Sequence, residues 1–229
     1  MQNSSLKVAL PKGRLYDEVI EACLKTDLLA SSEQISRLSR QLVQEVSVSG
    51  HLFLLAKPVD VPAYVEHGAA DIGFTGKDII AEKDRQLYEV FDLDVGNCDL
   101  VVAVPEEMEV ADLQDLPDNL RVATSYPRTT HRFFRRHNIK TEIIELGGSV
   151  ELAPQVDLAD IIVDITSTGT TLRENNLEPV AKVLSSSVRM VVNQSSYRTK
   201  SAAISKINRQ LKQNFKAASE SEEKARCSG

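Results

Sequence analysis

Apolar positions along this chain switch between short continuous runs and helical spacing. Residues 6–10 and 52–56 are compact apolar runs, which predict buried strands. Between them, one face of a helix is predicted from five apolar residues: Leu15, Val19, Ile20, Cys23 and Leu24. The chain is therefore expected to start as strand and helix, with a second buried strand further along.

The same alternation continues through the middle of the chain. A helix is predicted from near Asp60, where Pro62 suits the first turn, and another opens at Gly76-Lys77-Asp78. Strands are predicted at residues 71–74, 99–104, 121–124, 141–146 and 161–165, and helices at 128–137 and 149–156. Repeated strand and helix alternation is typical of an α/β fold with largely parallel strands.

The last quarter of the chain contains a strand-rich stretch, residues 180–192, which we expect to return the chain to the first lobe. A final helix places four apolar residues on one side: Ile204, Ile207, Leu211 and Phe215. Residues 217–229 are polar and charged and are expected to fray. The predicted lobes are residues 1–95 with 185–216, and residues 96–184, with a substrate cleft between them.

Composition excludes several classes of protein. Aromatic residues make up only 5% of the 229, so the core is expected to be aliphatic. The net charge is −6 and no dense basic run occurs, which argues against nucleic acid as the main partner. No signal pattern and no apolar stretch of about 18 residues is present, so we expect a cytoplasmic protein without a membrane span. Neither the three Cys nor the four His have the spacing of a disulfide framework or metal site.

The most informative stretch is residues 161–172, Ile-Ile-Val-Asp-Ile-Thr-Ser-Thr-Gly-Thr-Thr-Leu. A buried strand ends near the carboxylate of Asp164, and a loop of hydroxyl residues around Gly169 follows. Backbone N–H groups and hydroxyls in such a loop can face one anion, and glycine lets the backbone approach it. The alternative interpretation is a Thr-rich turn that caps a helix. The preceding carboxylate favours a sugar phosphate, whose hydroxyls it can bind.

Further motifs accompany this loop in a fixed order. They are Gly-Ser-Val-Glu-Leu-Ala-Pro and Leu-Ala-Asp within residues 147–160, the Lys-Gly-Arg turn of residues 8–15, the Asp-Val-Pro block of residues 60–78, and residues 189–197. Together they resemble the ATP phosphoribosyltransferase family over about residues 6–215. The chain's length is similar to the short form, which lacks a regulatory domain. The resemblance implies a two-lobed α/β fold like that of periplasmic binding proteins of type II.

The resemblance also implies the reaction. Phosphoribosyl would pass from phosphoribosyl pyrophosphate to N1 of ATP, giving phosphoribosyl-ATP and pyrophosphate in the first step of histidine biosynthesis. Magnesium would arrive bound to the substrate phosphates. The expected assembly is a homodimer within a hetero-octamer that contains a regulatory subunit resembling histidyl-tRNA synthetase.

Site residues follow from the same resemblance. The donor's phosphate and ribose would be held by Glu151, Asp164, Thr166, Ser167, Thr168, Gly169, Thr170 and Thr171. Lys12 and Arg14 would lie near the polyphosphates, although a solvated turn is the commoner interpretation of an isolated Lys-Gly-Arg. Arg40 would reach the leaving group across a subunit interface, and Lys57 would also act in catalysis. Lys12, Arg40 and Lys57 are the predicted catalytic residues.

Three positions depart from the family pattern. Lys57 stands where arginine is frequent, which keeps the charge but loses the planar grip on phosphate. Asp157 replaces a usual glycine and is expected to add a carboxylate near the ribose loop. Asn176 replaces another glycine, a mild change because asparagine tolerates a left-handed turn.

Two readings without turnover remain open. A solute-binding protein has the same two-lobed shape, and so has the effector-binding part of a transcription regulator. Neither a signal segment nor a helix-turn-helix module is visible in the sequence to favour them.

Overall fold

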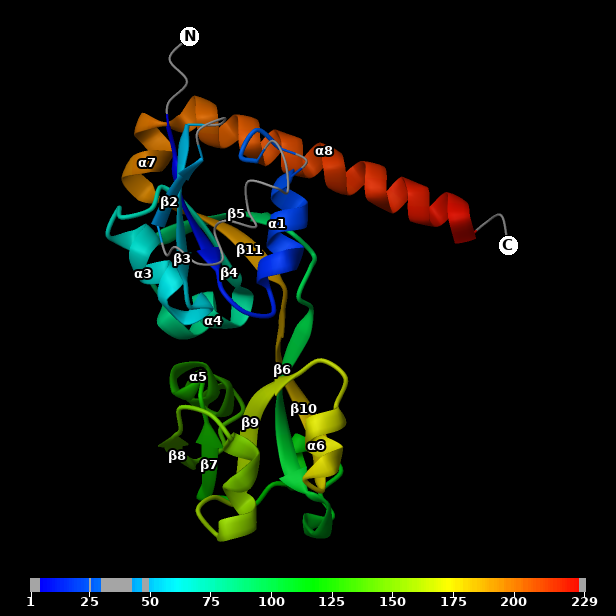
Figure 1. Ribbon diagram of the computed structural model, residues 1–229. Helices are drawn as coiled ribbons and strands as arrows, with labels where there is room; N and C mark the ends of the chain where they lie inside the picture. The colour runs from blue at the N-terminus through cyan, green and yellow to red at the C-terminus, as the bar shows by residue number, and fades with distance from the viewer. Residues whose placement is uncertain (1–4, 25, 30–42, 47–49, 227–229) are drawn as a thin grey trace. The chain divides into compact units, whose positions relative to one another are not determined.

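The computed structural model describes residues 5–24, 26–29, 43–46 and 50–226. Two compact units make up the chain: unit 1 is Met1–Gly96 with Ser187–Gly229, and unit 2 is Asn97–Ser186. Each unit has its own mixed sheet with helices on both faces (Figure 1).

The sheet of unit 1 has the strand order β2-β3-β1-β4-β11-β5. Its strands are β1 (Lys7–Pro11), β2 (Val43–Val46), β3 (His51–Ala56), β4 (Ile72–Gly76), β5 (Leu87–Asp92) and β11 (Val188–Asn193). β1 is parallel to β3 and β4, whereas β11 is antiparallel to β4 and β5. The chain returns to the first sheet at β11, whereas residues 180–186 of the predicted stretch belong to the sheet of unit 2. The edge strands β2 and β5 were not predicted; β2 is short and half of its residues are polar.

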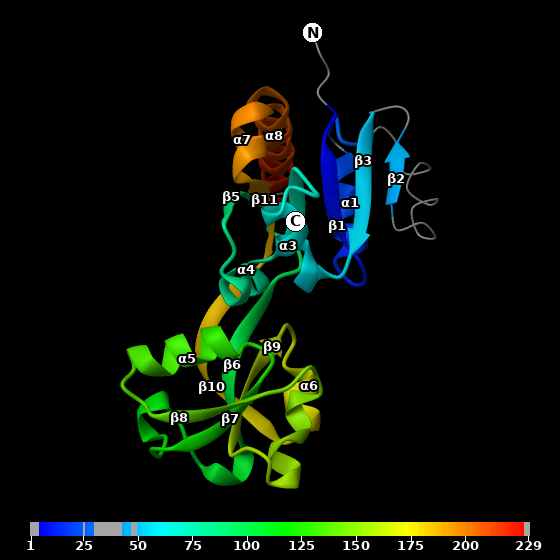
Figure 2. The same ribbon diagram turned by 90° about the vertical axis from the view of Figure 1, so that its left-hand side faces the viewer.

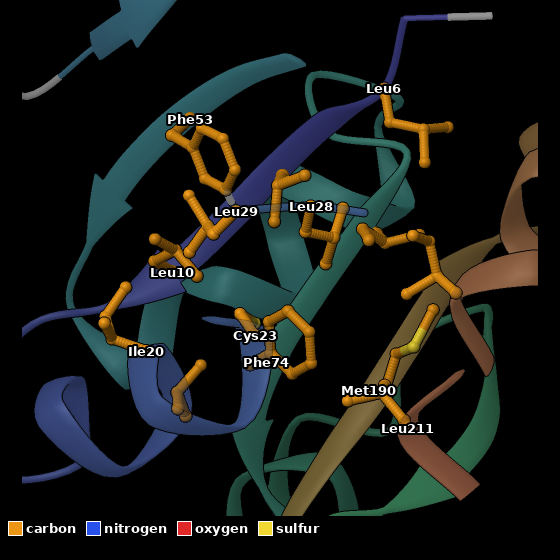
Figure 3. Close-up of a cluster of buried hydrophobic side chains, with 14 of the residues drawn as sticks. Leu6, Leu10, Ile20, Cys23, Leu28, Leu29, Phe53, Phe74, Met190 and Leu211 are labelled. Atoms are coloured by element: carbon orange, nitrogen blue, oxygen red, sulfur yellow. The ribbon is translucent and has the colours of Figure 1, made fainter. Parts of the chain in front are cut away.

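Helices cover both faces of this sheet. They are α1 (Tyr16–Leu24), α3 (Val61–Glu66), α4 (Lys77–Lys83), α7 (Gln194–Thr199) and α8 (Ser201–Arg226). α1 and α8 share one apolar core with the sheet, and Figure 3 shows Cys23 of α1, Met190 of β11 and Leu211 of α8 within it. α3 packs on the other face so closely that a Cβ on Gly73 would lie 2.7 Å from the side chain of Val61. The apolar spacing predicted for α1 and α8 is therefore confirmed for the side chains that the structure describes.

Helix α8 runs on through Arg226, and so includes part of the segment 217–229 for which the sequence predicted fraying. Within the described ranges, no helix combines the length and apolar character needed to cross a membrane.

The sheet of unit 2 has the strand order β10-β6-β9-β7-β8. Its elements are β6 (Cys98–Pro105), β7 (Leu120–Thr124), β8 (Thr141–Glu145), β9 (Ile161–Thr166), β10 (Leu177–Ser186), α5 (Pro127–Arg136) and α6 (Thr170–Glu174). α5 packs on one face through Phe134, and α6 packs on the other through Leu172 (Figure 2). The predicted strand and helix alternation is confirmed here.

Both units use the same arrangement of strands. In unit 1, the parallel strands β3-β1-β4 are followed by the reversed strand β11 and the outer strand β5. In unit 2, the parallel strands β8-β7-β9 are followed by the reversed strand β6 and the outer strand β10. The reversed strands are those that enter a unit from the other one. In open sheets of this kind, ligands bind at the carboxyl ends of the parallel strands. The loops after β1, β3 and β9 are therefore candidate ligand-binding loops.

An aspartate ties the amino ends of two strands together in each unit. Asp71, before β4, accepts the N–H of Lys7 at 2.7 Å and returns its own N–H to the Lys7 carbonyl at 2.8 Å. Asp160, before β9, accepts the N–H of Arg121 at 2.7 Å and returns its N–H to the Arg121 carbonyl at 2.9 Å. The same reciprocal pair thus sets the register at the end of the sheet opposite the candidate loops.

The predicted helix over residues 149–156 is wrong. The structure has two short 3₁₀ turns instead, η4 (Val150–Leu152) and η5 (Pro154–Val156). Pro154 has no N–H to donate, so an α-helical bond back to Val150 is impossible. Asp157 then takes a left-handed conformation with φ of 55°, which ends the second turn.

His51 makes the stability of unit 1 dependent on pH. It is 5% exposed, and its Nδ1 accepts the N–H of Leu6 at 3.1 Å. Burial lowers the pKa of His51, and nearby Lys200 acts in the same direction, although Asp27 and Asp71 oppose the shift. A protonated imidazole cannot accept the Leu6 N–H.

We expect the free energy of unfolding to be highest above about pH 6.5, the pKa of histidine in the unfolded chain. It should fall as the pH drops below that value. His51→Asn keeps an acceptor near Nδ1 but does not titrate, so it should flatten this loss. Urea unfolding between about pH 5 and 7.5 measures both proteins. An unchanged pH slope in the variant would contradict this role of His51.

Candidate functional site

The loop after β9 is built from hydroxyl side chains that hydrogen-bond within the loop. Gly169 has a φ of 72°, in the left-handed region that favours glycine, and donates its N–H to Thr166 Oγ1 at 3.0 Å. The hydroxyl oxygens of Thr168 and Thr170 lie 3.0 Å apart. The two residues on either side of Gly169 are exposed. This loop therefore presents neutral hydrogen-bonding groups to solvent at the carboxyl end of a parallel strand.

Asp164 stands beside this loop in a partly buried position. Strand alternation puts it on the same face of β9 as Ile162, which packs with Val150 of η4 and Leu172 of α6. Burial raises the pKa of the Asp164 carboxyl, a hydrogen bond from the Ile165 N–H at 2.8 Å opposes the rise, and the charge of Glu151 adds to it. Such a carboxylate favours hydroxyl donors or a positive charge next to it.

Glu151 reaches this position because its neighbours anchor η4. Val150 and Ala153 are each 1% exposed and belong to the same apolar cluster as β9. Gly147 and Gly148 precede the turn, and Ser149 enters it in a left-handed conformation with φ of 49°. The structure thus brings two carboxylates, 13 positions apart in the sequence, to the same face of unit 2.

Unit 1 carries positive charge at the carboxyl ends of β1 and β3. These strands end in register, with Pro11 beside Ala56, and the Lys12 N–H donates to the Ala56 carbonyl at 2.8 Å. Lys12, Arg14 and Lys57 follow the two strand ends and are all exposed. A cluster of cations at one sheet edge suits a polyphosphate.

Comparison with known proteins identifies the family. A model of the ATP phosphoribosyltransferase family matches residues 57–213. An ATP phosphoribosyltransferase of Halothermothrix orenii is 54% identical over 212 residues, which cover 91% of this chain and 95% of that protein. The chain belongs to the ATP phosphoribosyltransferase family. A second member, from Caldanaerobacter subterraneus subsp. tengcongensis, is 43% identical and covers 91% of this chain and 96% of its own.

Solved structures agree with this family and with the predicted fold. A chain of the ATP phosphoribosyl transferase HisG:HisZ complex from Thermotoga maritima has a TM-score of 0.76 and 36% identity, covering 91% of this chain and 97% of that one. The periplasmic aliphatic sulphonate binding protein SsuA from Escherichia coli has a TM-score of 0.61 at 12% identity and covers 96% of this chain and 76% of its own, which shows the fold alone. The predictions of the short form of the family and of an α/β fold like that of periplasmic binding proteins are confirmed.

The structure brings the predicted site residues of this family member together in two groups. Unit 2 gathers Glu151, Asp164, Thr166, Ser167, Thr168, Gly169, Thr170 and Thr171 around the carboxyl end of β9. Unit 1 gathers Lys12, Arg14 and Lys57 at the ends of β1 and β3. Arg40 lies outside the described residues. The individual roles of all these residues stay predictions.

Two departures from the family pattern have a backbone explanation. Asn176 has a φ of 52°, so the expected left-handed turn is confirmed. Asp157 is also left-handed, and its carbonyl accepts Nη1 of Arg121 at 2.7 Å. This places Asp157 at the amino end of β9, whereas the loop of hydroxyl residues, 166–171, lies at its carboxyl end. The expectation of an additional carboxylate near the ribose loop is therefore wrong.

Sequence reasoning missed one residue of the loop, Arg173. Its Nη2 donates to the Thr168 carbonyl at 3.2 Å and to Thr170 Oγ1 at 3.4 Å. The signal was available, since Arg173 follows Gly169 by four positions and the spacing i, i+4 places side chains on one helix face.

Proposed function

We propose that the hydroxyl loop, residues 166–171, binds the 5′-phosphate of phosphoribosyl pyrophosphate, and that Asp164 and Glu151 bind its ribose. The reaction is that of the family: a pentosyl transfer in which the C1–oxygen bond to pyrophosphate breaks and a bond from C1 to N1 of ATP forms. Phosphoribosyl-ATP and pyrophosphate are the products, and the step opens histidine biosynthesis. The observation that carries the assignment is a carboxylate on a parallel strand directly before a loop of hydroxyls and left-handed glycine.

The paired carboxylates suit the charge that develops on the sugar. Breaking the bond to pyrophosphate leaves positive charge on the ribose, and negative groups fixed beside it stabilise that charge. Burial, together with the negative charge of Glu151, makes the charge of Asp164 unfavourable in the free protein. The sugar hydroxyls and the developing cation would relieve this repulsion. The arrangement would therefore interact more strongly with the positively charged transition state than with the neutral sugar of the bound donor.

We assign the cations of unit 1 to the polyphosphate groups of the substrates. Lys12, Arg14 and Lys57 are exposed and follow strands at the ligand-binding edge of their sheet. We further propose that Arg40 acts from a neighbouring protomer on the departing pyrophosphate. Positive groups at the leaving group lower the barrier by offsetting its growing negative charge.

Magnesium belongs to the substrate side of this site. No group of three or more His, Cys, Asp or Glu able to hold a metal ion occurs in the part of the chain that the structure describes. Mg²⁺ is usually bound by one or two carboxylates together with substrate phosphates. The ion would arrive bound to the substrate phosphates and would offset the charge of the leaving pyrophosphate.

We propose that this chain works as a catalytic homodimer with a separate regulatory subunit resembling histidyl-tRNA synthetase, in a cytoplasmic hetero-octamer. The similar chain from Thermotoga maritima comes from a HisG:HisZ complex, which supports a second kind of subunit. The chain also covers nearly the whole length of the family members that it matches. Units 1 and 2 would be the two lobes of the catalytic fold.

An assay of product formation and a substitution of one loop hydroxyl test the assignment. The purified chain, with and without its regulatory subunit, should form phosphoribosyl-ATP from ATP, phosphoribosyl pyrophosphate and Mg²⁺, as measured by chromatography. Thr171→Ala should raise the KM for the donor roughly 10- to 100-fold, the range expected for a hydrogen bond to a charged group. Thr199→Ala is the control, because that hydroxyl donates to the Ser195 carbonyl on α7, outside the loop. Ligand binding without product would instead favour the solute-binding interpretation.

A further inference from the structure

The guanidinium of Arg173 lies against the hydroxyl loop. Besides the hydrogen bonds from Nη2 to the Thr168 carbonyl and the Thr170 hydroxyl, Nη1 lies close to Gly169. A Cβ placed on Gly169 would be 3.2 Å from Nη1. The cation therefore lies directly beside the position that a side chain of residue 169 would take.

The charge balance of the loop requires a cation at this position. Residues 161–176 contain three charged side chains, Asp164, Arg173 and Glu174, so Arg173 is the one positive group in this segment. A sugar phosphate dianion bound here would also meet the charge of Glu151 beside Asp164. Hydroxyls and backbone N–H groups alone do not offset the two charges of the phosphate together with those of Asp164 and Glu151 at close range.

The present partners of Arg173 are neutral and easily exchanged. Another arginine of unit 2, Arg121, is held by the carboxylate of Asp160 at 2.6 Å. Among the described residues, no carboxylate forms a salt bridge with Arg173, which is exposed and donates to a carbonyl and a hydroxyl at 3.2 Å and 3.4 Å. An arriving phosphate would replace these long bonds with shorter, charge-assisted ones.

We propose that Arg173 is the phosphate-binding cation of the loop and makes the site specific for a phosphorylated sugar. The inference rests on the proposed function and deepens it. When the donor binds, the guanidinium turns from the Thr168 carbonyl and the Thr170 hydroxyl to the 5′-phosphate oxygens. The Thr170 hydroxyl is then released to donate to the same phosphate. The planar fork of arginine suits two phosphate oxygens at once, which lysine cannot match.

Steady-state kinetics of the full chain with its regulatory subunit test this role. Arg173→Gln should raise the KM for phosphoribosyl pyrophosphate about 10- to 100-fold, while the KM for ATP changes less than about 3-fold. The KM of Arg173→Lys for phosphoribosyl pyrophosphate should lie between those of Arg173→Gln and the unchanged protein. Arg135→Gln, an exposed arginine near the end of α5, is the matched control and should leave both values unchanged.

Inhibition by ribose 5-phosphate and by ribose provides a second readout. The unchanged protein should prefer the phosphorylated sugar, and Arg173→Gln should lose most of that preference, an effect that a purely structural role would not produce. An unchanged donor KM, or an equal rise of both KM values with unchanged sugar preference, overturns the inference. If Asp164→Asn and Thr171→Ala also leave donor binding unchanged, the loop assignment itself fails. If those two variants weaken binding and Arg173→Gln does not, only the role of Arg173 fails.

Discussion

Asp164→Asn is expected to raise the thermal stability of this chain while it removes most of the turnover. Burial raises the pKa of Asp164, the Ile165 N–H opposes the rise, and Glu151 adds to it. The folded chain therefore holds this proton more tightly than the unfolded chain, and ionisation at neutral pH costs folding free energy. Asparagine removes that cost and still offers an oxygen to the Ile165 N–H. Loss of the charge, however, removes the strongest acceptor for the ribose hydroxyls.

We expect the free energy of unfolding at pH 7 to rise by about 0.5–2 kcal/mol, the usual range for a stabilising substitution. Turnover should fall about 100-fold or more if two charged hydrogen bonds to the sugar are weakened. The gain in stability should vanish below the unfolded-state pKa of about 3.9, because Asp164 is then neutral in both the folded and the unfolded chain. Thermal unfolding at several pH values and initial rates measure the two effects.

Asp99→Asn is the control for the sign of this effect. Asp99 also lies in the sheet of unit 2, but hydrogen bonds from Lys182 and Ser185 lower its pKa, so the same substitution should cost stability. Lower stability of Asp164→Asn at pH 7 would show that the carboxylate is favourable in the folded chain. Unchanged turnover would contradict the place of Asp164 in the donor site.

Asp71→Ala is expected to destabilise unit 1 by about 3–5 kcal/mol, the range for breaking a buried ion pair from one side. Asp71 is 5% exposed and accepts hydrogen bonds from Ser196 Oγ at 2.6 Å, Lys200 Nζ at 2.7 Å and the Lys7 N–H at 2.7 Å. Burial by itself raises the pKa of Asp71, but these donors outweigh it and lower the pKa. The stabilisation is thus present above about pH 3.9 and is lost as the pH falls through the lowered pKa.

Asp160→Ala provides the matched comparison, since Asp160 holds the equivalent strands of unit 2 but is more exposed. The free energy of unfolding should fall by about 1–2 kcal/mol in Asp160→Ala. Hydrogen exchange should locate each effect, with lower protection in unit 1 for Asp71→Ala and in unit 2 for Asp160→Ala. Asp71→Asn, which retains an acceptor, serves if the alanine variant does not fold. If both alanine variants lost the same free energy of unfolding, burial would not explain a larger contribution of Asp71.

The failures of sequence reasoning have particular causes. Residues 149–156 have helical apolar spacing, yet Pro154 removes the central hydrogen bond and two 3₁₀ turns result. The strand β5 was missed although residues 87–91 contain four apolar residues in five, the same share as residues 6–10. Asp157 was assigned to the wrong end of β9 because distance along the chain does not tell which neighbour a side chain meets.

By itself, the sequence determined the α/β class, the family and the candidate donor loop. The fold class and the loop could be predicted because buried strands, helical faces and hydroxyl loops around a glycine are local patterns, visible within about ten residues. The family followed from the resemblance of several motifs, in a fixed order, over about residues 6–215. Only the tertiary structure turned Arg173 onto Thr168 and Thr170 and joined Asp71 to Lys7 across 64 positions. Those contacts depend on strand order and on which side chains burial brings together, and neither is encoded in the spacing of residues along one segment.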